Sequence, residues 1–147
     1  MQGETFDVGV SRHFTVPAEN VFDAFVQPDK ARRFLFATET GEMVVADIDA
    51  RVGGAFTLTD RRPGVGDVEH IGRFLEVEPP ERLVFLVRAV PYQEEDAKVS
   101  ILIRSRGDEC DLDLTVMADV KWRDHAEKTR DGWTLILDNL AREVGSS

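Results

Sequence analysis

The chain has 147 residues, of which 18 are Lys or Arg and 28 are Asp or Glu, and its formal net charge is −10 at pH 7. This length suits one domain with a single core, and the negative charge repels phosphate backbones and anionic lipid surfaces, so nucleic acid is not expected as a partner. The single cysteine excludes an internal disulfide, and the absence of a secretory signal and of any apolar run near about 20 residues favours a cytoplasmic protein with no membrane span.

A strand and a short helix are predicted at the N-terminal end. Phe6, Val8 and Val10 alternate with polar or small residues, which is the period-two pattern of a strand with one buried face. Pro17 is tolerated in a first helical turn, and Glu19 suits the positive end of the helix dipole there. The apolar residues that then share one helical face are Ala18, Val21, Phe22 and Phe25.

A second short helix is predicted directly after the first. Pro28 is expected to end the first helix, because proline does not continue one. Asp29 is expected to cap the second helix, which runs from Lys30 to Phe34 and ends in the apolar sequence Phe34-Leu35-Phe36. Two short helices therefore separate the first strand from the rest of the chain.

The middle of the chain predicts an antiparallel meander of six strands. Alternating or apolar runs without a helical period span 43–49, 54–60, 67–77, 82–90, 97–105 and 109–118. Turn residues separate them, among them Gly53-Gly54, Pro79-Pro80 and Gly107-Asp108. In the last run, apolar residues alternate with Asp111 and Asp113, which are interpreted as solvating the outer face of the sheet.

The last segment predicts a long helix over 124–144. Asp124 and Glu127 have capping-box spacing, so the helix is expected to begin at Asp124. One helical face carries the apolar residues Ala126, Trp133, Ile136, Leu137, Leu140 and Val144. Gly132 is expected to let a strand approach this helix closely, and Gly145 to close its last turn. About 20 residues give a rod of about 30 Å, long enough to underlie the whole fold.

These elements together predict an α+β fold in one domain covering 1–147. Seven strands accumulate enough twist to curl around a helix that lies across them. Such a half-barrel leaves a space between sheet and helix. The architecture therefore predicts a cup, but the sequence does not identify what the cup holds.

Several stretches resemble the AHSA-like branch of the START/SRPBCC superfamily. They are VPAENVFDAF at 16–25, VGG at 52–54, GRFLEV with PPERL at 72–83, and GW at 132–133 before LDNL at 137–140. The resemblance covers almost the whole chain and implies the helix-grip fold, a seven-stranded curved antiparallel sheet around a long C-terminal helix. Many members carry tryptophan near the end of the second short helix, where this chain has Phe34-Leu35-Phe36, so the shape of the cavity does not carry over.

The resemblance also implies a small-ligand cup. Relatives in the superfamily bind lipids, sterols or polyketides, some as aromatase/cyclases and some as self-resistance proteins that sequester a toxin. The family is named for a eukaryotic co-chaperone that stimulates a heat-shock chaperone's ATPase, although this chain resembles only the C-terminal part of that protein. A chaperone is therefore a further possible partner.

Eight residues are candidates for the wall of the cup: Phe34, Phe36, Phe56, His70, Phe85, Tyr92, Trp133 and Leu137. His70 either enters the cup as a donor or acid/base, or is an ordinary surface or hydrogen-bonded histidine, and the second interpretation carries more weight. Tyr92 is either a donor at the rim or a loop residue, and the loop residue is favoured. Phe34 is expected at the mouth, and Arg88 outside the sheet.

Metal and cofactor chemistry find no support in the sequence. His13, His70, His125 and Cys110 lack paired ligand spacing, so no metal site is predicted. Residues 64–66, Gly-Val-Gly, lack the third glycine and the following helix of a dinucleotide site. No Gly-x-Ser-x-Gly elbow is present, so nucleophilic catalysis has no support and no cofactor is expected.

Three functions remain open from the sequence. The first is a module that encloses a small, largely apolar or aromatic ligand. The second is a cyclase or aromatase-type enzyme, which requires two or more convergent titratable groups inside the cup, whereas a cavity without polar groups favours the binding module. The third is a modulator of a chaperone ATPase that acts by its surface. Whether the chain is a monomer or a homodimer is not determined by the sequence.

Overall fold

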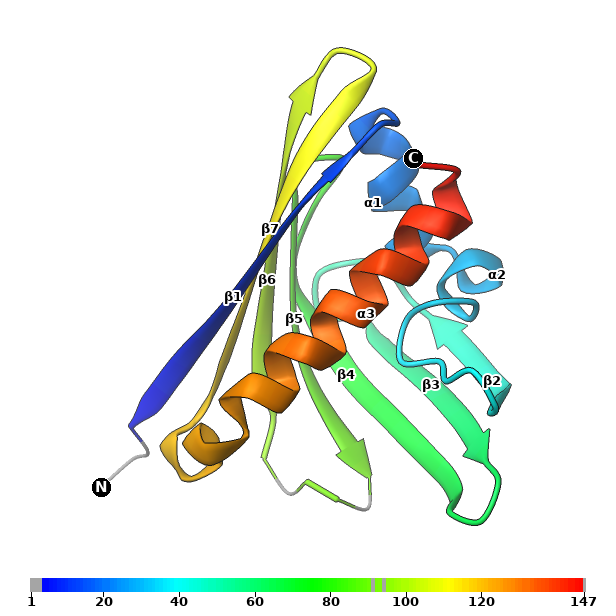
Figure 1. Cartoon of the computed structure of the whole chain (residues 1–147), viewed down its shortest axis with the longest axis vertical. Coiled ribbons are helices and arrows are strands. Elements are labelled where there is room, and N and C mark those ends of the chain that lie inside the picture. The colour runs from blue at the N-terminus through cyan, green and yellow to red at the C-terminus, as the bar shows by residue number, and fades with distance from the viewer. Residues whose placement is uncertain (1–3, 91, 94, 147) are drawn as a thin grey trace.

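An antiparallel sheet curls around one long helix in the computed structural model, which describes residues 4–90, 92–93 and 95–146 (Figure 1). The strands within these residues are β1 Thr5–Phe14, β2 Glu42–Ile48, β3 Ala55–Arg62, β4 Gly66–Glu78, β5 Arg82–Val90, β6 Ala97–Arg106 and β7 Glu109–Asp119. The helices are α1 Ala18–Val26, α2 Pro28–Ala31, the 3-10 helix η1 Val120–His125 and α3 Ala126–Val144. This architecture confirms the predicted helix-grip fold.

The sheet has the order β1-β7-β6-β5-β4-β3-β2, and every neighbouring pair is antiparallel. Strands β2 to β7 form the predicted meander, and β1 pairs with β7 along its whole length, from Thr5 opposite Asp119 to Phe14 opposite Cys110. Register shifts interrupt the pairing of β2 at Met43/Val45 and of β4 at Phe74/Glu76. Such bulges bend a strand and increase its twist, which helps the sheet to curl.

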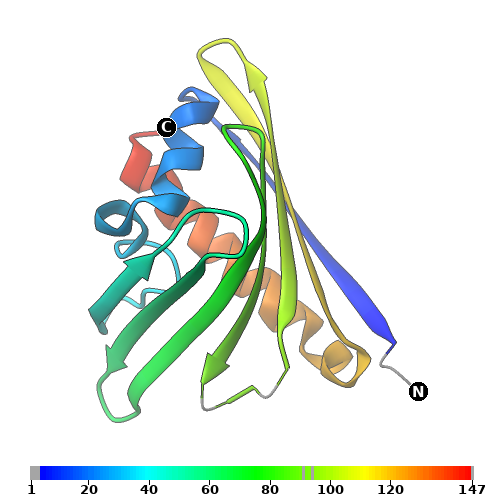
Figure 2. The same cartoon turned by 180° about the vertical axis from the view of Figure 1, so that it is seen from behind.

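All three α-helices lie on the concave face of the sheet, as the two opposite views show (Figures 1 and 2). The helix α3 crosses this face diagonally, and α1 and α2 cover it beside the C-terminal half of α3. The apolar face of α3, here called its stripe, packs against the sheet as predicted. Its buried residues are Trp133, Leu137, Leu140 and Ala141. Gly145 closes the helix with a φ of 76°, the left-handed conformation expected of it.

Two predicted helix starts are wrong. His125, not Asp124, precedes α3 and makes no side-chain cap, because residues 120–125 first form a 3-10 turn that Asp119 caps through a bond from the Lys121 amide at 2.9 Å. Pro28 begins α2 instead of only ending α1, and Asp29 lies in its first turn without capping it. Proline fits the first helical position because its missing N–H is not needed there.

Close packing in the curl of the sheet depends on Gly72 in β4. A Cβ placed on Gly72 would lie 2.1 Å from the Leu86 carbonyl oxygen and 2.4 Å from the Phe56 ring. The Phe56 ring therefore lies directly over the β4 backbone, which only glycine permits at this position.

In the described part of the chain no helix is long and apolar enough to cross a membrane.

Two leucines of α3 test the packing of the stripe. Leu137 is 1% exposed, whereas Leu135, two residues earlier, is 56% exposed. Leu137→Ala is expected to lower the free energy of unfolding by about 2 to 5 kcal/mol, because it leaves a cavity in the core. Leu135→Ala is the matched control and should change it by less than about 0.5 kcal/mol. Urea denaturation measures both, and equal effects would contradict this orientation of α3.

Candidate functional site

A cavity of about 330 Å³ lies between the N-terminal half of α3 and the concave face of the sheet. Its wall is largely apolar and comes from strands β4 to β7, from η1 and α3, and from the loop before β2. The apolar side chains are chiefly Phe36, Val87, Val99, Val116, Trp133 and Ile136. Since Val87, Val99, Val116 and Trp133 are all less than 9% exposed, the cavity reaches into the core.

The mouth of the cavity is polar. It is lined by side chains of both charges, Glu95, Asp96, Asp119, His125 and Lys128. Lys121, beside it, forms an ion pair with Glu95 at 2.6 Å and lies over the Trp122 ring, 5.8 Å from its centroid. The Trp122 ring also lines the cavity, so an aromatic surface and paired charges meet at this opening.

Three rings from distant parts of the chain meet on one side of the cavity. The Phe36 ring stacks on the His70 imidazole with centroids 4.1 Å apart and an interplanar angle of 1°. The Trp133 ring meets Phe36 edge-on at 5.5 Å. The loop before β2, strand β4 and helix α3 thus each contribute one ring to the cavity wall.

Phe36 has a backbone conformation that is unusual for its residue type. Its φ is 61°, in the left-handed region, where residues other than glycine are uncommon. Such a conformation costs free energy and persists only where the surrounding contacts hold it. Here the stacked His70 and the edge-on Trp133 hold the Phe36 side chain against the cavity.

Asp60 ties the Phe36 loop to the sheet. Its carboxylate in β3 is 1% exposed and accepts hydrogen bonds from Thr38 Oγ1 at 2.7 Å and from Arg62 Nε at 2.9 Å. Arg62 also donates to the Phe36 carbonyl oxygen at 3.5 Å. A buried carboxylate needs such partners, and their presence fixes the loop beside the cavity.

His70 is neutral at pH 7. Burial is the main cause that lowers its pKa to about 4, the positive charge of Arg62 lowers it further, and Asp60 acts in the opposite direction. Its Nδ1 atom is buried and has no hydrogen-bond partner. The inward orientation of His70 supports the cavity interpretation of the two that the sequence left open.

The other half of the space under the sheet is packed with aromatic side chains. Phe56, Phe74 and Phe85 contact one another with ring centroids 5.3 to 6.2 Å apart. They border a void of only about 10 Å³. Phe25 and Phe34 add an edge-on pair at 5.3 Å, because α1 and the turn that follows α2 insert these rings into the core. The fold therefore contains a filled half and an open half.

The structure brings three of the eight candidate residues to the cavity: Phe36, His70 and Trp133. Phe34, expected at the mouth, is fully buried beside Phe25 at the filled end. Phe56, Phe85 and Leu137 are also buried in the core, and none of them lines the cavity. Tyr92 is 57% exposed and does not line the cavity, although the next residue, Gln93, does.

Gly132 has the opposite role to the one predicted. A Cβ placed on it would find no heavy atom within 4 Å, so no strand approaches α3 there. Gly132 instead lines the cavity and widens it. Sequence reasoning also missed Trp122 and His125, because the 3-10 turn that positions them was not predicted, and it missed Lys128 in the first turn of α3. The only signal in the sequence was the helical spacing of Trp122, His125, Lys128 and Gly132, which follow one another at intervals of three or four residues.

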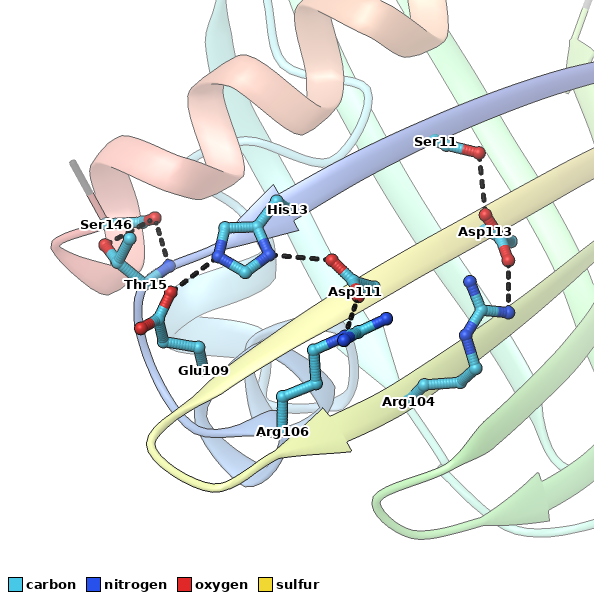
Figure 3. A network of polar contacts seen from close by, with 9 residues as sticks. All are labelled: Ser11, His13, Thr15, Arg104, Arg106, Glu109, Asp111, Asp113 and Ser146. Carbon is cyan, nitrogen blue, oxygen red and sulfur yellow. Dashed lines mark hydrogen bonds and ion pairs between the residues drawn. The ribbon is translucent and has the colours of Figure 1, made fainter.

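A polar network lies on the sheet at the β6–β7 hairpin (Figure 3). His13 on β1 contacts Glu109 through Nε2 at 2.6 Å and Asp111 through Nδ1 at 2.7 Å, and Arg106 pairs with the same Asp111. Asp113 accepts a hydrogen bond from Ser11 at 2.6 Å and pairs with Arg104. The two aspartates interpreted as solvating residues therefore join three strands.

The network in Figure 3 shifts the pKa values of its members in opposite directions. Hydrogen bonds to Asp111 and then Glu109 raise the pKa of His13, and the bond from His13 lowers the pKa of Asp111. Among the described residues, no group of three or more His, Cys, Asp or Glu is placed to hold a metal ion. Cys110 is buried, and burial raises the pKa of its thiol to about 11, so it is not a thiolate nucleophile.

A curved antiparallel sheet, a long helix across its concave face and an apolar cavity between them define a helix-grip protein. The sequence model of the family described as "Activator of Hsp90 ATPase homolog 1-like protein" matches residues 15–145. The chain belongs to this family, as its motifs predicted. Among curated proteins, no sequence match is found.

Solved structures share this fold. A protein of Chromobacterium violaceum is 26% identical, with 94% of this chain and 96% of that chain covered and a TM-score of 0.82. An AHSA1-like protein from Aeromonas hydrophila is 24% identical, with 95% and 92% covered and a TM-score of 0.82. DynU16, described as a protein in the dynemicin biosynthetic locus, is 16% identical, with 95% of this chain but 47% of that chain covered and a TM-score of 0.75.

Gly132→Ala tests whether the space beside α3 is open. Alanine is favoured over glycine in a helix, and the new methyl group meets nothing within 4 Å. The substitution should therefore raise the free energy of unfolding by about 0.5 to 1 kcal/mol in urea denaturation. A destabilised Gly132→Ala would show that a neighbouring element does lie close to this face of α3.

The pKa of His70 predicts a loss of stability in acid. Because its pKa of about 4 lies below the ordinary value of 6.5, the unfolded chain binds more protons at intermediate pH, and stability falls as the pH falls below 6.5. Between pH 8 and pH 5 this contribution is about 2 kcal/mol. Urea denaturation of His70→Phe at the two pH values should show a correspondingly smaller loss than the wild type.

His13→Gln is the matched control for this pH dependence. The raised pKa of His13 contributes stability that is present below pH 6.5 and lost as the pH rises through the folded pKa. Removing His13 should therefore increase the loss between pH 8 and pH 5 instead of reducing it. If both variants shift the loss in the same direction, the assignment of the two histidines is wrong.

Proposed function

We propose that this protein binds a small, largely apolar, aromatic ligand in the cavity between α3 and the sheet. The observation that carries the proposal is the cavity of about 330 Å³, lined by buried apolar side chains in an otherwise packed domain. Protein interiors rarely keep voids larger than a water molecule, and an apolar cavity costs stability. A space of this size with an apolar wall is characteristic of ligand pockets.

The rings around the cavity favour a planar, aromatic ligand. The Phe36 and Trp133 rings stand at 76° to each other within the wall, and Trp122 lies at the mouth. A flat ring system can stack on one ring and meet another edge-on, and both arrangements add to the free energy of simple burial. The fold shared with DynU16, from a biosynthetic locus, is in keeping with a small organic ligand.

The distribution of titratable groups favours binding over catalysis. Among the described residues, the titratable side chains that line the cavity besides His70 are Glu95, Asp96, Asp119, His125 and Lys128. Glu95 is held there by Lys121. His70 forms no hydrogen bond with any of these groups, which supports binding over the acid–base catalysis of a cyclase-type enzyme. The family's description names a chaperone ATPase, and modulation of such an ATPase is the alternative function.

Ligand binding to the cavity is tested with naphthalene and a panel of flavonoids and fatty acids. A ligand that binds the native state at a hundredfold excess over its Kd stabilises it by about 2.7 kcal/mol, so at least one compound should raise the melting temperature by several degrees. Val116→Phe, which fills the cavity from a residue 4% exposed, should abolish that increase.

Thr115→Phe is the matched control, because Thr115 is the neighbouring residue on the exposed face of β7. It adds the same ring outside the cavity and should leave the ligand-induced increase unchanged. If no compound stabilises the wild type, or if Val116→Phe and Thr115→Phe respond alike, the cavity is not a ligand site. Binding of the wild-type protein to a heat-shock chaperone in that case would favour the family-based alternative.

A further inference from the structure

We propose that His70 is the specificity residue of the cavity and selects aromatic ligands that carry a hydroxyl group. This inference rests on the proposed function and names the chemical class of its ligand. The position of His70 in the middle of the sheet is the first argument. Its partners across the ladder are Leu58 on β3 and Ala89 on β5, so the imidazole projects from a central strand into an apolar wall.

The second argument is that the hydrogen-bonding capacity of His70 is unused. Its Nδ1 is buried without a partner, and no hydrogen bond joins either ring nitrogen to a described residue. Its ring contact is with Phe36, which fixes the plane of the imidazole but satisfies no polar atom. Because Nδ1 is buried, the nitrogen that a ligand in the cavity meets is Nε2, which likewise has no hydrogen-bond partner among the described residues.

The third argument concerns which ligand group complements the ring. A neutral imidazole carries one N–H donor and one acceptor nitrogen, and either tautomer can present its accessible nitrogen to the cavity. A hydroxyl group both donates and accepts, so it fits both tautomers. An ammonium or carboxylate would bury a charge beside a neutral partner, which is unfavourable in an apolar wall.

The stacking of His70 on Phe36 also sets the orientation of the ligand. The two rings are parallel to within 1°, and Trp133 stands at 76° to Phe36. A ligand ring that meets the edge of the imidazole can place a hydroxyl in the plane of His70 while its own apolar surface contacts Trp133. The apolar body of the ligand then fills the space beside Val99 and Val116, and its polar group is directed toward β4.

The polar groups at the mouth discriminate less than His70 does between ligands with and without a hydroxyl group. The Oε2 atom of Glu95 pairs with Lys121, and Asp119 accepts from the Lys121 amide. Thr129 on α3 is a further hydroxyl that lines the cavity. Glu95 Oε1 is also buried without a hydrogen-bond partner, but it belongs to a carboxylate that is paired with Lys121 and can only accept, whereas a neutral imidazole both donates and accepts. Selectivity therefore depends on His70.

The test compares naphthalene with 2-naphthol, two probes that differ by one hydroxyl group. Titration calorimetry gives the Kd of each for the wild type and for His70→Phe, which keeps a ring stacked on Phe36 but removes both nitrogens. The ratio of the two Kd values should shift against 2-naphthol by about fivefold to tenfold in His70→Phe, the effect of losing one neutral hydrogen bond. His70→Leu gives the same comparison if His70→Phe does not fold.

Thr129→Val is the matched control, since it removes a hydroxyl from the cavity lining at nearly constant volume. It should leave the ratio of the two Kd values unchanged. A ratio that is unchanged in the His70 variants, or that shifts in Thr129→Val instead, overturns the assignment of His70 while ligand binding stands. If the wild type binds neither naphthalene nor 2-naphthol and no other compound of the panel, the proposed function itself fails.

Discussion

The structure depends on the contact between one face of α3 and the concave side of the sheet. Every other element is placed with respect to this contact. Trp133, Leu137 and Leu140 bury the stripe of the helix, and the sheet curls until its strands meet that stripe. One helix cannot cover a seven-stranded concave face alone, so α1 and α2 fill the area beside its C-terminal half (Figure 1). The area beside its N-terminal half stays uncovered, and the cavity follows directly from this.

The residues around the cavity give up stability that ordinary packing would provide. Gly132 places no side chain where space is available, and Phe36 holds a left-handed backbone conformation. His70 places a neutral imidazole without a hydrogen-bond partner in the apolar wall. These three departures from ordinary packing lie together beside the cavity. Such concentration is typical of functional sites, where a bound ligand supplies the missing contacts.

Two histidines show how position in the fold determines ionisation. His13 and His70 are the same chemical group, but His13 lies between two carboxylates on the exposed side of β1 and its pKa is raised. His70 is desolvated near Arg62 and its pKa is lowered to about 4. His13 therefore binds a proton more readily than an ordinary histidine, whereas His70 stays neutral at pH 7 and adds no charge to the apolar wall. This difference keeps the wall compatible with an apolar ligand in a protein of net charge −10.

The sequence by itself determined the elements of the fold and the family. Period-two and helical patterns are local, so the strands, the stripe of α3 and the cap at Gly145 could be predicted from neighbouring residues. Only the tertiary structure decided which half of the cup is filled. Phe34 and Phe36 are two residues apart and equally apolar, yet one lies in the core and the other lines the cavity. That difference arises from the left-handed turn at Phe36 and from contacts with β3, β4 and α3, which are distant in the chain and leave no periodic signal in it.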